Sequence, residues 1–147
     1  MKTHLLSIAG LLICPFLFSQ ILTVNDGSSV SINSGSSITI DGLEIAPADT
    51  YTISGANDVS RSATAATVDT NSSVSRVYST SALLSGFTGT LTFSYLDGEL
   101  NDIVEGDLVL ELQADDDSWT TYTGTVDEVN NTAVSYTHLT LPTTGSV

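Results

Sequence analysis

The densest group of side chains that could do chemistry lies in residues 97–107, DGELNDIVEGD. Its oxygen-bearing members are Asp97, Glu99, Asn101, Asp102, Glu105 and Asp107. Proteins bind Ca²⁺ through about six to eight oxygen ligands, many of them carboxylates and amides from a short loop. These residues are therefore a candidate Ca²⁺ site, and Ca²⁺ is the only cofactor that the sequence suggests.

The spacing of these residues departs from that of an EF-hand calcium loop. Asp97, Glu99 and Asn101 follow its alternating ligand positions. However, Asp102 stands where that loop requires glycine, and Leu108 stands where it requires a closing glutamate. Two interpretations stay open: an irregular Ca²⁺ loop, or solvated acids in the connections between strands.

Catalysis by the same residue types would need partners that the sequence does not supply. A glycosidase pair requires one carboxyl group held protonated by burial, whereas the acids here fall in predicted turns or on outward strand positions. A serine nucleophile requires a base, and residues 20–132 contain no histidine or lysine. We therefore predict no catalytic residues and no enzyme. Trp119 and Tyr122 could form a platform on which a sugar stacks, although a core position is more common for such a Trp.

The elements that must position these residues are short strands. Thr88–Tyr95 alternates apolar and polar residues, which is typical of a half-buried strand. Further strands are expected at residues 50–54, 74–79, 107–113, 119–122 and 126–129. Short strands at roughly ten-residue spacing predict an all-β fold, an antiparallel, Ig-like β-sandwich. Its expected core contains Leu91, Phe93, Leu108, Leu110 and Trp119.

Residues 25–40 contain a small repeat, NDGSSVSI followed by NSGSSITI. Each copy joins an Asx-Gly turn signal to two alternating apolar residues. Two hairpin arms are favoured over a β-helix, and serine-rich low complexity is the alternative. Because such strands carry little apolar area, residues 20–49 are expected to be a weakly packed lead-in to a sandwich module at residues 50–132.

The N-terminal residues 1–19 predict a secretory signal peptide. Lys2 and His4 precede an apolar run that ends at Ser19, which is the order of a basic start, an apolar segment and a small residue at the cleavage site. The run is shorter than the roughly 20 apolar residues of a membrane helix, so we expect no membrane insertion after cleavage. The predicted location is secreted or at the cell surface, and the mature chain has no cysteine for disulfides.

The charge of the mature chain is strongly negative. All 17 acidic residues lie between residues 20 and 132, where Arg61 and Arg76 are the only cations. Nucleic acids and anionic membrane surfaces are recognised by basic patches. Neither is therefore an expected partner, whereas cations are compatible counter-charges.

The last residues, VSYTHLTLPTTGSV, contain no acid and include His138, one of two histidines. Residues 134–147 resemble the translation of a sequencing-library adapter, a transposase mosaic end followed by its read primer, and the preceding codon fits Ala133. We therefore expect residues 133–147 to be a non-native tail and the sandwich to be incomplete at its C-terminus. A genuine strand with alternating side chains is the alternative.

The features FSY, DGELN, DLVLE and GTVDEVNN, together with a signal peptide ending in Ser-Gln, resemble the Ser/Thr-rich β modules of secreted Bacteroidetes proteins. Those proteins carry a C-terminal type IX secretion sorting domain, which is absent here. The resemblance covers residues 21–132 and implies a non-catalytic structural or adhesive module. The expected partners are a surface polysaccharide or protein and further domains of the same chain. A Ca²⁺-dependent or carbohydrate-binding module, and an accessory domain of an enzyme, stay open as alternatives.

Overall fold

The computed structural model describes residues 22–81, 86–114 and 117–138. The predicted signal peptide and the last nine residues of the predicted adapter tail lie outside these ranges. No helix among the described residues is long and apolar enough to cross a membrane.

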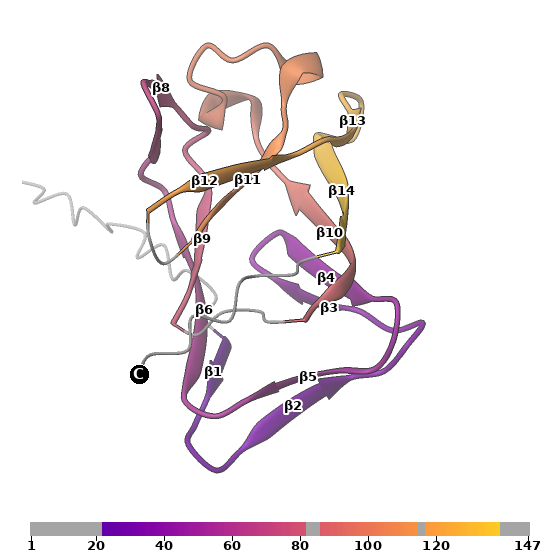
Figure 1. Cartoon of the computed structure of the whole chain (residues 1–147). Coiled ribbons are helices and arrows are strands. Elements are labelled where there is room, and N and C mark those ends of the chain that lie inside the picture. Colours follow the sequence, from indigo (N-terminus) through magenta and orange to yellow (C-terminus); the bar gives the residue numbers. More distant parts are fainter. Residues whose placement is uncertain (1–21, 82–85, 115–116, 139–147) are drawn as a thin grey trace, which may run out of the picture.

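The described residues form short strands and two single-turn 3₁₀ helices (Figure 1). The elements are β1 (Leu22–Val24), β2 (Ser29–Ile32), β3 (Ile38–Ile40), β4 (Leu43–Pro47), β5 (Tyr51–Ser54), β6 (Asn57–Ser62), β7 (Thr67–Val68), β8 (Asn71–Ser72), β9 (Val77–Thr80), β10 (Thr88–Ser94), η1 (Asp97–Glu99), η2 (Glu105–Asp107), β11 (Leu110–Gln113), β12 (Trp119–Tyr122), β13 (Gly124–Asp127) and β14 (Thr132–His138).

All recorded strand pairings are antiparallel. The largest sheet has the order β13-β14-β10-β4-β3, and a second has the order β1-β6-β9. The pairs β11-β12, β2-β5 and β7-β8 form separate two-stranded sheets. The predicted all-β antiparallel fold is confirmed. The Ig-like arrangement stays a prediction, because these sheets have open edges and do not close into two continuous layers.

The core is formed largely by the first half of the chain. Ile45, Val59 and Phe87 are fully buried, and they form one cluster with Val24, Ile32, Ile40, Leu43, Ile53 and Leu91. The expectation that residues 20–49 pack weakly is therefore wrong. These residues also share sheets with the predicted module, because β4 pairs with β10 and β2 pairs with β5. Strands that are apolar on one face only can still complete a core when other sheets cover that face.

The two repeat copies form the predicted turns but do not pair with each other. Ser28 N–H donates to Asn25 C=O, and Ser36 N–H donates to Asn33 C=O, both at 3.0 Å. Gly27 and Gly35 have φ values of 75° and 78°, which glycine adopts without strain. The strand after the first turn pairs with β5, and the strand after the second pairs with β4. Local sequence thus specifies the turns, while the partners come from elsewhere.

The expected core of the later strands is confirmed only in part. Leu91 is buried, and Phe93 and Leu110 pack against the cluster. Leu108 and Trp119 are half-buried and are not members of it. The strand predicted at residues 107–113 begins only at Leu110, because Asp107 N–H and Leu108 N–H close the turn of η2 through bonds to Val104 and Glu105 carbonyls.

Candidate functional site

The acidic loop, residues 97–107, follows β10 and contains η1 and η2. It adjoins the turn between β13 and β14, because Tyr95 N–H donates to Asn131 C=O at 3.0 Å. Leu96, Val104 and Val129 are exposed apolar residues of this region. The loop is therefore fixed to the sheet at its start and lies at one end of the molecule (Figure 1).

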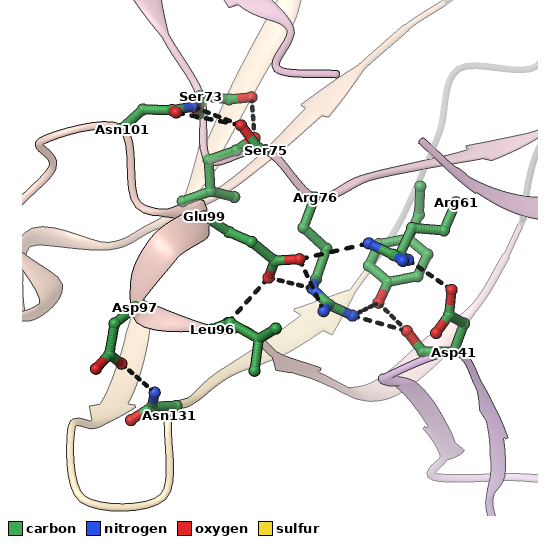
Figure 2. Close-up of polar contacts among 12 residues, drawn as sticks. Asp41, Arg61, Ser73, Ser75, Arg76, Leu96, Asp97, Glu99, Asn101 and Asn131 are labelled. Atoms are coloured by element: carbon green, nitrogen blue, oxygen red, sulfur yellow. Dashed lines mark hydrogen bonds and ion pairs between the residues drawn. The ribbon is translucent and has the colours of Figure 1, made fainter. Parts of the chain in front are cut away.

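Glu99 binds both arginines of the described chain, as Figure 2 shows. Arg76 Nε donates to Glu99 Oε2 at 2.8 Å, and Arg76 Nη2 donates to Oε1 at 3.0 Å. Arg61 Nη1 reaches Oε1 at 3.4 Å. Leu96 N–H also donates to Oε2, at 2.9 Å. Every oxygen of Glu99 is thus engaged within the protein.

The same arginines connect Glu99 to Asp41 in the turn between β3 and β4. Arg61 Nε contacts Asp41 Oδ2 at 2.5 Å, and Arg76 Nη1 donates to the Asp41 carbonyl at 2.9 Å. The Tyr78 hydroxyl donates to this carbonyl at 2.7 Å. We call Asp41, Arg61, Arg76, Tyr78 and Glu99 the arginine cluster. It joins a turn of the largest sheet, two strand segments and the acidic loop.

The arginine cluster shifts the ionisation of its members. Burial alone would raise the pKa of Glu99, but the hydrogen bonds from Arg76 and Leu96 and the charges of both arginines lower it below its ordinary value. Burial would lower the pKa of Arg76, and its bonds to Glu99 and Tyr78 raise it instead. Burial raises the pKa of Tyr78. These shifts stabilise Glu99 as the anion and Arg76 as the cation.

Asn101 and Asp97, two further predicted Ca²⁺ ligands, also bind other groups. Asn101 Nδ2 donates to the Ser73 carbonyl at 2.7 Å and to Ser75 Oγ at 3.0 Å. Asp97 Oδ1 accepts a hydrogen bond from Asn131 Nδ2. These contacts attach the acidic loop to the segment before β9 and to the turn before β14.

The three remaining predicted ligands differ in how far their side chains are exposed to solvent. Asp102 and Asp107 are exposed, whereas Glu105 Oε1 is buried and has no hydrogen-bond partner among the described residues. The buried Tyr95 hydroxyl likewise has none there. Burial raises the pKa of Tyr95 to about 12, with a smaller contribution from Glu105. Tyr95 is therefore neutral at neutral pH and lies beside Glu105.

The candidate Ca²⁺ ligands do not converge on a common point. Within the described ranges, no three histidine, cysteine, aspartate or glutamate side chains are arranged to hold a metal ion. Glu99 belongs to the arginine cluster, Asn101 binds Ser73 and Ser75, and Asp97 binds Asn131. Hydrogen bonds and ion pairs within the protein therefore already engage side-chain oxygens of three of the six candidates, Asp97, Glu99 and Asn101.

The proposed sugar platform is not formed by Trp119 and Tyr122. On β12 these residues are three positions apart, and a strand places such positions on opposite faces. Tyr122 pairs with Leu110 and packs against the core cluster. Trp119 pairs with Gln113 on the other face.

Comparison with known proteins finds no matching family model, no matching curated protein and no matching solved structure. Asp41, Arg61, Arg76 and Tyr78 were not expected from the sequence to form a polar centre. One signal was present: between residues 20 and 132 there are 17 acids and only two arginines, so each arginine has many carboxylates available as partners.

Proposed function

We propose that the chain is a non-catalytic, exported β module with a structural or adhesive role in a larger protein. The observation that carries this proposal is the arginine cluster. It includes Glu99, one of the candidate residues for chemistry, and its side chains bind one another across four separate segments of the chain. Residues with this arrangement position loops on a scaffold. The predicted signal peptide and the resemblance to secreted β modules support the same role.

The acidic surface is compatible with an adhesive role outside the cell. Asp102, Asp107 and Glu128 are exposed near the exposed apolar residues Val104 and Val129. Acidic side chains keep such an end soluble, while the apolar groups can contact a partner.

The proposal is tested on purified residues 20–147. We expect cooperative unfolding, resistance to proteases, and retention on immobilised surface polysaccharides or proteins. The same preparation is assayed for hydrolysis of glycosides, esters and peptides. Hydrolysis that copurifies with the chain and is lost in Asp102→Asn or Glu105→Gln, while the fold is retained, would overturn the proposal. Loss of retention without hydrolysis would leave the structural role and remove the adhesive one.

A further inference from the structure

A cavity of about 1060 Å³ lies between β9, β10 and β11. This volume is at the upper end of the roughly 300–1,000 Å³ of sites for small molecules. Leu91 and Phe93 of β10, and Tyr95 directly after it, line it at alternate positions, with Leu91 and Tyr95 themselves buried. Because alternate residues of a strand point to the same side, the face of β10 forms the floor of the cavity.

Unlike β10, which contributes alternate residues, β9 contributes consecutive residues to the lining of the cavity. Every residue of this strand, from Val77 to Thr80, lines the cavity. Because successive residues of a strand point to opposite faces, the cavity meets β9 along its length and not through one face alone. Its other neighbour, β6, contributes no lining residue. β11 resembles β9 in this respect, because its residues from Leu110 to Gln113 all line the opposite wall. The cavity, which we call the slot, therefore lies alongside β9 and β11 and above the face of β10.

The edge of β9 in this slot is open in the described structure. β9 is the last strand of the sheet β1-β6-β9, and its recorded partner is β6 alone. An open edge presents backbone N–H and C=O groups that can pair with an added strand. β9 is also held in place, because Tyr78 binds Asp41 at the arginine cluster. A guest strand at this edge would find a partner that is already positioned.

The slot is acidic around its apolar floor. Its lining residues include five acids, Asp69, Asp102, Asp107, Glu111 and Asp117. Arg76 is the one cation among the lining residues, and it is bound to Glu99. Glu111 lies on β11 between Leu110 and Leu112, which pack against the core, so its side chain points to the other face. An extended guest with basic residues on its outward face would meet these carboxylates.

We propose that this slot binds an extended, cationic segment of a partner protein, which pairs with β9 as an additional strand. Its alternate apolar side chains pack on Phe93, which is only half-buried, and its lysine or arginine residues face Glu111 and the neighbouring acids. Main-chain hydrogen bonds supply affinity in this type of recognition, while side-chain pockets and charges supply selectivity. The inference deepens the adhesive role and rests on it for the nature of the partner.

The test uses a short capped peptide of alternating valine and lysine, titrated into the whole chain. Trp119 is the one tryptophan of the chain and lines the cavity, so its fluorescence reports binding. Hydrogen exchange should show new protection of the β9 amides. Three comparison peptides separate the causes: one with glutamate for lysine, one with valines and lysines in separate blocks, and one N-methylated at alternate residues. We expect each to bind at least about tenfold more weakly, since each removes charge pairing, alternation or main-chain bonds.

A matched pair of variants tests the acidic wall. Asp107→Asn with Glu111→Gln and Asp117→Asn should weaken peptide binding by about tenfold. Asp26→Asn with Asp49→Asn and Asp58→Asn removes the same charge at exposed positions outside the lining and should change binding by less than about twofold. Equal effects of the two sets would overturn the proposed complementarity.

The remaining outcomes also decide the proposal. Equal binding of the N-methylated peptide, or protection confined to other strands, would overturn strand addition. Concentration-dependent dimers that protect β9 without peptide would make a second copy the occupant. Protection of β9 that disappears when residues 139–147 are removed would assign the slot to this chain. Peptide binding without retention on any surface would uphold the slot and refute the adhesive role. Retention that saturating peptide does not reduce would refute the slot as the adhesive site.

Discussion

The arginine cluster gives the sharpest single test of the structure, through Glu99→Gln. This change keeps the shape of the side chain and removes its charge. In the native protein, Glu99 accepts hydrogen bonds from Arg76 and from Leu96 N–H, and it contacts Arg61. A glutamine presents an NH₂ group to one of these donors, so at least one guanidinium contact becomes donor against donor.

The expected loss of unfolding free energy is about 2–3 kcal/mol. A hydrogen bond to a charged group contributes about 1.5–3 kcal/mol, and breaking a fully buried ion pair costs about 3–5 kcal/mol. The side chains of Arg76 and Glu99 are 11% and 15% exposed, so water screens the pair slightly. Arg76 also keeps its bond to the Asp41 carbonyl. Both facts place the expected loss at the lower end of the cost of breaking a fully buried ion pair, or just below it.

Urea unfolding followed by Trp119 fluorescence measures this loss. Because the pKa of Glu99 is lower in the folded than in the unfolded protein, its contribution is fully present above the ordinary carboxylate pKa. It is lost as the pH falls through the lowered folded value. The difference between the native chain and Glu99→Gln should therefore shrink progressively in acid below the ordinary value.

Asp49→Asn is the matched control, because Asp49 is an exposed acid outside the cluster. It should change the unfolding free energy by less than about 0.5 kcal/mol. If Glu99→Gln behaves like this control at neutral pH, or if its effect does not depend on pH, the assignment of Glu99 as the central anion is refuted.

Four further predictions test the core, the backbone, the acidic loop and the last strand. Ile45→Ala should cost about 2–5 kcal/mol in chemical denaturation, and Leu110→Ala less, because Ile45 is fully buried and Leu110 only half-buried. Gly89→Ala should destabilise by more than about 1 kcal/mol, because its φ of 156° suits glycine and a Cβ would strike the backbone of Ala46 and Pro47; a neutral effect would contradict this approach. Millimolar Ca²⁺ should leave the calorimetric midpoint unchanged in the native chain and in Asp102→Asn, whereas a specific rise would restore the Ca²⁺ site. Deleting residues 134–147 should destabilise strongly, because β14 pairs with both β10 and β13; an unchanged denaturation midpoint would show that this pairing contributes nothing.

The last of these predictions reverses what the sequence suggested. A non-native tail would be expected to matter little, yet residues 132–138 form a strand inside the largest sheet. Alternating residues of high β-propensity can occupy a vacant position beside a strand whatever their origin. The resemblance to an adapter is therefore compatible with this pairing and stays a prediction about the encoding DNA.

Most strands and turns could be predicted from the sequence because their causes are local. The alternation in Thr88–Tyr95 predicts β10, and Asx-Gly pairs predict the turns at Gly27 and Gly35. The start of β11 was missed, because the turn of η2 depends on backbone bonds that alternation does not show. The burial of residues 24–45 was also missed, because burial depends on which sheet covers a strand.

The sequence by itself determined the charge, the all-β class and the turns, since these follow from composition and from neighbours along the chain. Only the tertiary structure decided what the acids do. Glu99 is 23 residues from Arg76 and 38 from Arg61, yet all three meet beside Asp41. A spacing that resembles a metal loop is a local property, whereas the competition between a cation and an arginine for one carboxylate is settled by which distant strands the fold brings together.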